Sequence, residues 1–400
     1  MYASRLKWKK SERATNGGSV QHWTLRRSMR GKKGAAAAGG AAAGGKASHS
    51  PAPAAAKPAK RNSIVNTVRK SLGRSKKSAP AAAPAGDNDI TVSETLIGGG
   101  LKGVEVIDNT SGARVKVAYH GGNLCSYRAT DGKEKLFHSK KAKTDMSKPL
   151  RGGVPVVFPQ FGAGPLSQHG FARTSMWTLC DGELAPRMED GMVHLAMSLK
   201  SNKETMKQWP FKFELVHHIR FGPKELETSM NIINRDSKPF DFQALLHTYL
   251  KFKNINQATI EGLEGLRYVD KLEYVVPGEP RQVWVEKSNK LKVASEVDNI
   301  YYNAENAPIV ITSPADNSRV EIHMALCRGD EMTDCDAVMW NPGTGKGNRM
   351  ADFSMPEWQS MLCIEPGCAS RTEVCQPGET WTVTQNIKFG RISKYGVRNA

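Results

Sequence analysis

From residue 88 onward, apolar and polar residues alternate over many short stretches, and this period of two predicts β-strands. The most regular stretches are separated by Gly, Pro and Asn turns and cover residues 114–120, 192–200, 211–221, 225–234 and 381–389. In residues 211–221 the odd positions read Phe, Phe, Leu, His, Ile and Phe, so His217 lies on the apolar face and His218 on the opposite face. Both histidines fit this alternation and are interpreted as structural.

Helical periodicity is scarce, and "PEWQSM" (residues 356–361) is a short segment expected to form a turn or two of helix. Three glycine-rich strings, residues 98–103, 162–166 and 343–347, are interpreted as turns, because none completes a phosphate-binding loop in front of a helix. Short strands throughout this part predict an all-β fold, either an antiparallel sandwich or a barrel, rather than alternating strands and helices.

The positive charge of the chain is confined to its beginning. The formal net charge is +18, but residues 1–86 hold 19 Lys and Arg against one acid, Glu12, which leaves 38 basic and 38 acidic residues in the remainder. Residues 1–88 are rich in Ala, Gly, Pro and Lys and are predicted to be a disordered basic tail, with one short amphipathic helix at residues 63–74. Residues 89–395 are expected to form the folded domain.

The tail leaves two interpretations open. A basic, Ser- and Ala-rich, acid-poor beginning resembles a transit peptide for a plastid or a mitochondrion, and it is equally typical of a solvated extension on a cytoplasmic protein. Such a tail is able to bind polyanions non-specifically and in a salt-sensitive way, whereas the neutral remainder predicts no specific nucleic-acid binding.

Several classes of protein are disfavoured. No apolar run reaches the ~18 residues of a membrane span, so no membrane insertion is expected. Seven cysteines without C-x-x-C spacing favour neither a zinc site nor a secreted disulfide framework, and they indicate a reducing compartment. No metal site is expected, and the chain is expected to be a monomer.

Four ionisable residues interrupt apolar runs: His169, His247 in "QALLHTYLKF", Asp298 in "SEVDNIYYN" and Glu365 in "QSMLCIEPG". A lone histidine among apolar residues is more often a hydrogen-bonded core residue than a catalytic one. Glu365 differs, because a carboxylate that follows Met-Leu-Cys-Ile is expected to be partly desolvated, with its pKa raised toward neutrality. Such a carboxylate suits a general base, and a neighbouring imidazole suits a general acid.

The stretch "RGGVPVVFPQFGAGPLSQHGFAR" (residues 151–173) contains an arginine at each end and no acidic residue. One interpretation is a buried strand, Val154–Phe158, followed by a Pro-Gly loop. The other is an anion-binding wall, because the planar guanidinium groups of Arg151 and Arg173 match the geometry of a phosphate.

Five motifs in this order resemble the glucose-6-phosphate 1-epimerase family, a branch of the aldose 1-epimerase group: "RGGVPVVFPQFG", "LSQHGFAR", "LLHTYL", "VMWNPGTGKGNRMADF" and "CIEPG…PGETW". The resemblance covers residues 90–390 and implies a galactose mutarotase-like antiparallel β-supersandwich. It implies that His247 is the general acid and Glu365 the base. It further implies that Arg151, Gln168 and Arg173 hold the substrate, with the arginines at its phosphate, and that Asp298 contacts sugar hydroxyls. His169 and Asp270 fall in similar motifs.

The function implied by this resemblance is interconversion of the α and β anomers of a hexose 6-phosphate, chiefly glucose 6-phosphate, by ring opening and reclosure. No redox change or group transfer occurs, so no cofactor is expected. A catalytically idle sugar-phosphate binder on the same sandwich is the alternative.

Overall fold

A computed structural model describes residues 7–11, 22–26, 89–276 and 278–392. The chain divides into two compact units, Met1–Lys60 and Arg61–Ala400. In the first unit, β1 (Lys7–Ser11) pairs antiparallel with β2 (His22–Arg26). These two strands fall within the segment predicted to be disordered. The rest of residues 1–88, with the expected helix at 63–74, lies outside the described residues, so the disordered tail and the transit peptide stay predictions.

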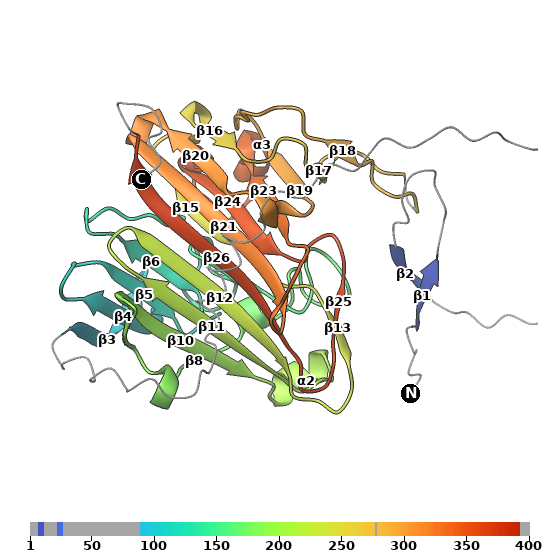
Figure 1. Ribbon diagram of the computed structural model, residues 1–400, viewed down its shortest axis with the longest axis horizontal. Coiled ribbons are helices and arrows are strands. Elements are labelled where there is room, and N and C mark those ends of the chain that lie inside the picture. The colour runs from blue at the N-terminus through green and yellow to red at the C-terminus, as the bar shows by residue number, and fades with distance from the viewer. Residues whose placement is uncertain (1–6, 12–21, 27–88, 277, 393–400) are drawn as a thin grey trace, which may run out of the picture. The chain divides into compact units, whose positions relative to one another are not determined.

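The second unit contains a ten-stranded antiparallel sheet that runs along one side of the fold (Figure 1). Its order is β16 (Thr259–Glu261), β20 (Ile309–Ser313), β21 (Ser318–Arg328), β26 (Thr380–Arg391), β12 (Glu225–Asn234), β11 (Phe213–Phe221), β10 (Met192–Lys200) and β8 (Thr178–Leu179). The two remaining strands of this sheet are β22 (Glu331–Thr333), which pairs with β21, and β9 (Arg187–Glu189), which pairs with β10.

A second large sheet has eight strands. Its order is β18 (Trp284–Val285), β17 (Arg267–Asp270), β19 (Val297–Tyr301), β23 (Asp336–Asn341), β24 (Met361–Gly367), β14 (Leu245–Leu246) and β7 (Val156–Val157), and β15 (Thr248–Lys251) also pairs with β24. Two smaller sheets complete the unit: β3 (Ile90–Ile97), β4 (Leu101–Asp108), β5 (Arg114–Ala118) and β6 (Leu124–Arg128) in one, and β13 (Phe240–Phe242) with β25 (Glu373–Cys375) in the other.

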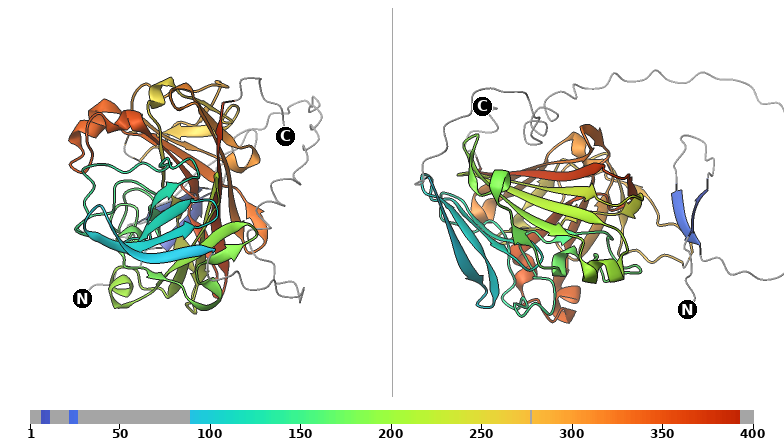
Figure 2. Two further views of the ribbon diagram at one scale, coloured as in Figure 1. Left: turned by 90° about the vertical axis from the view of Figure 1, so that its left-hand side faces the viewer. Right: turned by 90° about the horizontal axis from the view of Figure 1, so that it is seen from below.

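The two large sheets share one hydrophobic core. Leu195 of β10 and Val383 of β26 lie in the same buried cluster as Leu362 and Ile364 of β24, and Val115 of the four-stranded sheet joins them. Alternate residues of β24, Leu362 and Ile364, therefore point into this core, as the alternation of a strand requires. The sheets are stacked as layers (Figure 2), so the prediction of an antiparallel sandwich is confirmed.

The strands follow the sequence pattern closely. Strands β10 and β12 have the predicted bounds, and β11 begins two residues later than predicted. His217 is fully buried on the inner face of β11, and its Nδ1 lies 3.0 Å from the carbonyl oxygen of Gly122. It is therefore a hydrogen-bonded core residue, as the alternation predicts.

Helices are short within the described part of the chain. They are α2 (Lys203–Gln208), α3 (Gly343–Arg349) and the 3-10 helices η1 (Ala172–Thr174), η2 (Gly182–Leu184), η3 (Ile255–Gln257), η4 (Ala304–Asn306), η5 (Pro314–Asp316) and η6 (Glu357–Ser360). Helix η6 confirms the turn predicted at residues 356–361. None of the described helices is long and apolar enough to cross a membrane.

The buried strand, one of the two interpretations of residues 151–173, is present in part: all five residues of Val154–Phe158 are buried, but the regular strand is β7 alone. Pro155 has no N–H to donate to a ladder. One prediction was wrong. The string at residues 343–347 forms the first part of α3 instead of a turn. Gly343 opens that helix in the left-handed region, at φ +56°, where a Cβ atom would lie 2.4 Å from the Glu296 nitrogen.

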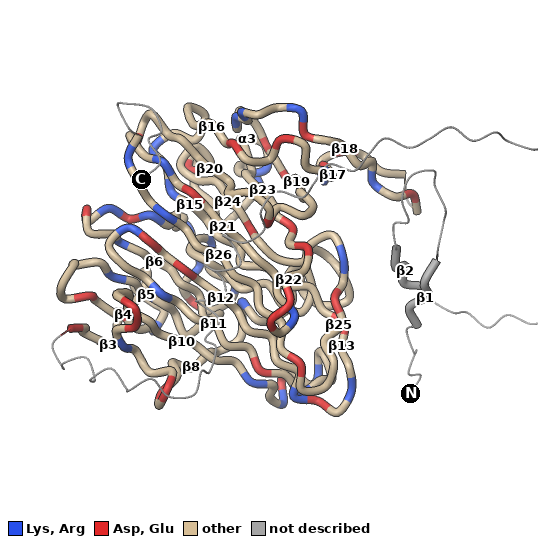
Figure 3. The backbone as a smooth tube through the Cα atoms, viewed as in Figure 1, with Lys and Arg blue, Asp and Glu red and all other residues tan. Residues whose placement is uncertain are grey.

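Acidic and basic residues are interspersed over the second unit (Figure 3). This distribution agrees with the balanced charge of the sequence after residue 86. The compartment and the oligomeric state of the protein stay predictions.

Candidate active site

The predicted site residues gather on the face of the eight-stranded sheet that points away from the shared core. In β24, Leu362 and Ile364 enter that core, so Cys363 and Glu365 point to the opposite face. By the same alternation, Tyr249 lies on this outer face next to Cys363.

Strand register places side chains of this face in a row across four adjacent strands. Asp298 of β19 is paired with Trp340 of β23, Trp340 with Cys363 of β24, and Cys363 with Tyr249 of β15. His247, between β14 and β15, packs on the same surface, with its ring stacked on Tyr249 at 4.7 Å and 4°. Four strands that are distant in sequence thus build one continuous site.

His247 and Glu365 face each other at the centre of the site. Nδ1 of His247 lies 3.2 Å from Oε1 of Glu365. This is an ion-pair distance, but among the described residues Nδ1 has no partner in hydrogen-bonding geometry, and neither has Oε2 of Glu365. The two side chains are almost completely buried, with relative exposures of 6% and 1%.

Burial favours the uncharged form of each partner. It lowers the pKa of His247 well below the ordinary imidazole value, and His169, Arg173 and Arg151 act in the same direction. Burial raises the pKa of Glu365 well above the ordinary glutamate value, and Asp298 raises it further, while Lys271 and Arg173 lower it. The desolvated Glu365 expected from the sequence is therefore present.

His169 stands beside this pair, with its ring centroid 5.8 Å from that of His247 and 5.2 Å from that of Phe161. Its backbone is left-handed, at φ +64°. The N–H of Gly162 donates to its Nδ1 at 3.3 Å, so the neutral ring carries its proton on Nε2. Burial lowers the pKa of His169 to about 3, and the nearby positive charges act in the same direction. These charges belong to Arg173, Lys271, Arg151 and Lys346.

Arg151 is held by two residues that sequence reasoning missed. Its Nε and Nη2 donate to the Asp352 carboxylate at 3.0–3.3 Å, and its Nη1 donates to the Tyr249 hydroxyl at 3.0 Å. Burial lowers the pKa of Arg151, but Tyr249 and Asp352 more than offset this and raise it overall. Tyr249 had a signal in the sequence, because it lies two positions after His247, the spacing that places two side chains on one face of an extended chain.

Arg173, in η1, has fewer partners. Its Nη2 donates to the backbone oxygen of Gln168 at 2.5 Å, and its Nε is buried without a partner in the part of the chain that the structure describes. Burial lowers its pKa to about 10, so it remains a cation at neutral pH. The side chain of Gln168 is exposed, and its Nε2 lies 3.5 Å from Nε2 of His169.

Asp298 sits between two lysines that the sequence analysis did not single out. Lys271 Nζ lies 3.2 Å from Oδ1, and Lys346 Nζ lies 3.7 Å from Oδ2. Lys271 Nζ also lies 4.7 Å from the centroid of the Phe161 ring, where a cation–π contact is favourable. The carboxylate of neighbouring Asp270 accepts the N–H of Leu272 at 2.8 Å, which gives Asp270 a local role at the end of β17.

The donor set at the centre is able to hold a metal ion, although the sequence predicts none. The ligand atoms of His247, Cys363 and Glu365 all lie within 4.8 Å of one another. Neighbouring strands bring these residues together, so sequence spacing alone gave no signal for them beyond the two-residue interval between Cys363 and Glu365.

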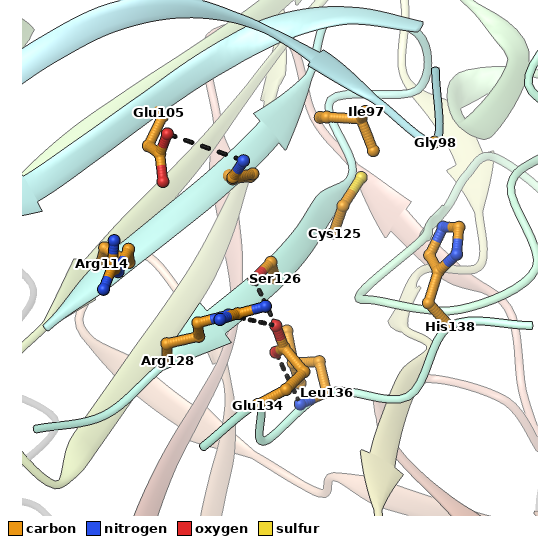
Figure 4. A pocket seen from close by; sticks show the side chains of 11 residues that line it. Ile97, Gly98, Glu105, Arg114, Cys125, Ser126, Arg128, Glu134, Leu136 and His138 are labelled. Carbon is orange, nitrogen blue, oxygen red and sulfur yellow. Dashed lines mark hydrogen bonds and ion pairs between the residues drawn. The ribbon is translucent and has the colours of Figure 1, made fainter. Parts of the chain in front are cut away.

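A separate cavity of about 350 Å³ lies on the four-stranded sheet and contains none of the predicted site residues (Figure 4). Its charged side chains are largely paired with one another, Lys116 with Glu105 at 3.6 Å and Arg128 with Glu134 at 3.7 Å. This cavity is therefore distinct from the candidate site on the outer face of the eight-stranded sheet.

Solved structures share this fold. A crystal structure from Salmonella typhimurium, titled "a putative mutarotase", superposes with a TM-score of 0.62 at 23% identity, covering 76% of this chain and 97% of that chain. A galactose mutarotase-like protein from Clostridium acetobutylicum superposes with a TM-score of 0.57 at 16% identity, covering 76% of this chain and all of the other. At these identities the likeness shows the galactose mutarotase-like fold alone.

Sequence comparison goes further. A protein of Cenchrus ciliaris is 32% identical over 272 residues, 66% of this chain and 78% of the relative. One of Escherichia coli K12 is 27% identical over 294 residues, 72% of this chain and 90% of the relative. Both are named "Putative glucose-6-phosphate 1-epimerase". The profile of the family described as aldose 1-epimerase matches residues 104–388. The chain therefore belongs to the aldose 1-epimerase family, a family of enzymes that interconvert sugar anomers.

Proposed function

We propose that the protein interconverts the α and β anomers of hexose 6-phosphates, with glucose 6-phosphate as the chief substrate. The observation that carries the proposal is the buried pair of His247 and Glu365, whose Nδ1 and Oε1 atoms lie 3.2 Å apart. Glu365 removes the proton of the anomeric hydroxyl while His247 protonates the ring oxygen. The ring opens, the aldehyde end rotates, and closure on the other face reverses both transfers.

The protonation of the pair supports this chemistry. Burial favours a neutral imidazole and a neutral carboxylic acid, which together hold one transferable proton. Passing that proton from Glu365 to His247 gives a carboxylate base and an imidazolium acid without exchange with solvent. The pair thus supplies one acid and one base for each ring opening and returns to its starting state after closure.

The cations around the pair favour a phosphorylated sugar. Arg151, Arg173, Lys271 and Lys346 all lie close enough to act on the pKa of His169. The carboxylates paired with them are Asp352, Asp298 and Glu296, so the cations exceed the carboxylates by one. This excess favours an anionic group on the substrate, and the Arg173 guanidinium, whose buried Nε has no partner among the described residues, is the proposed phosphate ligand. Gln168 and His169 complete the proposed substrate contacts, and Asp298 is assigned to the sugar hydroxyls.

The test is a panel of pure anomers of glucose 6-phosphate, mannose 6-phosphate, glucose and galactose, followed to equilibrium by polarimetry or proton NMR. We expect acceleration over the buffer blank for the phosphorylated sugars and little for the free ones. A rate equal to the blank for all four overturns the proposed function. Equal acceleration of free and phosphorylated sugars leaves the reaction standing and overturns the phosphate specificity.

A further inference from the structure

The thiol of Cys363 lies beside the acid/base pair, and the proposed reaction does not use it. Cys363 and Glu365 stand two residues apart on β24, so their side chains leave the strand on the same face, and His247 reaches the same place from the residue between β14 and β15. The Nδ1 or Nε2, Sγ and carboxylate atoms of the three residues lie within 4.8 Å of one another. Cys363 is fully buried, as the other two nearly are.

Two of these three side chains carry polar atoms without a partner. Nδ1 of His247 and Oε2 of Glu365 are buried, and neither makes a hydrogen bond within the part of the chain that the structure describes. A buried polar atom without a partner costs about 1–3 kcal/mol. Both groups therefore gain by binding whatever species enters the space between them and the thiol.

We propose that His247, Cys363 and Glu365 form a binding site for a thiophilic divalent cation such as Zn²⁺, and that the bound ion switches the acid/base pair off. Imidazole nitrogen, thiolate sulfur and carboxylate oxygen are the ligands that zinc takes, and three protein ligands leave a fourth position for water. The metal occupies the atoms that the reaction needs, so catalysis and metal binding exclude each other. The inference that a metal binds rests on the geometry alone. The inference that the bound metal inhibits catalysis rests also on the proposed function.

The spacing suits a tetrahedral ion. Nitrogen and oxygen ligands at 2.0–2.2 Å from zinc stand about 3.4 Å apart, and Nδ1 of His247 lies 3.2 Å from Oε1 of Glu365. Nitrogen and sulfur ligands stand about 3.6 Å apart, so the thiol must approach by at most about 1.2 Å from the 4.8 Å limit. Rotation about the Cα–Cβ bond of Cys363, the one side-chain bond that moves its sulfur, is the motion required.

The charges also select the kind of metal. The site is surrounded by cations, among them Arg151, Arg173 and Lys271. A dication is stable there only if its ligands cancel its charge, as the Cys363 thiolate and the Glu365 carboxylate do once coordination has released two protons to solvent, one from the thiol and one from the His247–Glu365 pair. Mg²⁺ and Ca²⁺ require more oxygen ligands than this site offers, so they are expected not to bind.

The experiment uses the full chain with Co²⁺ as a spectroscopic probe and Zn²⁺ as the inhibitor. The variants are Cys363→Ala, Cys363→Ser and, as matched control, Cys368→Ala, which removes another fully buried thiol outside the three-residue site. Thermal melting checks that each variant is folded. We expect a thiolate-to-cobalt charge-transfer band, with one metal per chain, in the wild type and in Cys368→Ala, and no band in either Cys363 variant.

Zinc inhibition is then measured with each variant normalised to its own metal-free rate. Removing even a residue that only supports a ligand costs about 10- to 100-fold in metal affinity, so half-inhibition of the Cys363 variants should need at least about tenfold more Zn²⁺. The proposal is overturned if the wild type shows no charge-transfer band, or if the band survives in Cys363→Ala. A band that depends on Cys363, in a chain that proves inactive on every sugar, supports the metal site and overturns the proposed function instead.

Discussion

Arg151 and Asp352 form a two-point ion pair, in which Nη2 and Nε of the arginine both donate to Oδ2 of the aspartate, at 3.0 and 3.2 Å. With the Tyr249 hydroxyl on Nη1, all three nitrogens of Arg151 have partners within the protein. Within the described residues, Arg173 instead has a single backbone partner and a buried, unpartnered Nε. The two arginines predicted to clamp the phosphate are therefore not equivalent.

Replacing Arg173 by alanine is expected to lower kcat/KM selectively for phosphorylated substrates. A charge-assisted hydrogen bond contributes about 1.5–3 kcal/mol, so kcat/KM for glucose 6-phosphate should fall about 10- to 100-fold. Residual activity on free glucose should scarcely change. Arg173→Lys should recover only part of the loss, because an ammonium lacks the guanidinium fork. Steady-state kinetics on both sugars is the measurement.

Arg151→Ala is the matched control for this prediction. This change leaves the part-buried carboxylate of Asp352 without its counter-charge. It should therefore lower the melting temperature and reduce kcat/KM equally for free and phosphorylated sugars. If Arg173→Ala produced that second pattern, Arg173 would be a structural residue and the phosphate assignment would be wrong.

The pH dependence of kcat should show a broad plateau through neutrality. The pair is active while it holds one transferable proton. That state lasts from the pKa of His247, lowered by burial, to the pKa of Glu365, raised by burial. Both pKa shifts widen the pH range over which the pair holds one transferable proton. The phosphate of the substrate titrates near pH 6, so kcat at saturation is the quantity to follow. A rate that declines above about pH 6.5, as for an ordinary imidazolium acid, would contradict the neutral pair.

Lys271→Met should move the alkaline limb of the profile of kcat/KM to higher pH. Lys271 lowers the pKa of Glu365 and also pairs with Asp298, which raises it. Removing the ammonium therefore raises the pKa of Glu365 by both routes. Lys346→Met is the matched control, because Lys346 also pairs with Glu296, and its removal should shift the limb less. A limb that stays in place, or moves down, in Lys271→Met would show that Lys271 does not tune Glu365.

The sequence pattern predicts features that depend on neighbouring residues along the chain. Alternation placed His217 inside and gave the bounds of β10 and β12, because a strand's period of two is a local property. The same local rule marks Tyr249 and Cys363 as neighbours of His247 and Glu365 on one face. It carries no information on which strands lie side by side.

Contacts between segments far apart in the chain were accordingly missed. Asp352 reaches Arg151 across 201 positions, and Lys271 reaches Asp298 only because β17 and β19 are adjacent in the sheet. Helix α3 was missed because a glycine-rich string has low intrinsic helix propensity, and its tertiary surroundings decide its conformation.

Stability should fall as the solution is acidified from about pH 6.5 to about pH 4. Burial lowers the pKa of His194, His217 and His218 to about 4, whereas unfolded histidines titrate near 6.5. Between these values the unfolded chain binds more protons, so protonation favours unfolding, by on the order of 3 kcal/mol for fully buried His217. Urea midpoints at pH 7, 5.5 and 4.5 measure the effect.

The matched variant is His217→Gln, which does not take up a proton. It should be less stable than the wild type at pH 7, because it loses a packed ring, and should lose less stability on acidification. If both proteins lost stability equally between pH 7 and pH 4.5, buried His217 would not be a source of the acid sensitivity.

The most direct measurement of the acid/base pair is the exchange between the α and β anomers of glucose 6-phosphate in wild type and Glu365→Gln, by NMR magnetisation transfer, together with calorimetric binding of the same sugar. Glutamine keeps the size of the side chain but removes the carboxyl group that passes the proton. We expect binding to persist while the enzymatic exchange rate falls by about two to four powers of ten. Unchanged exchange in Glu365→Gln, or a wild type that binds the sugar phosphate without exceeding the buffer rate, would contradict the proposed acid/base pair.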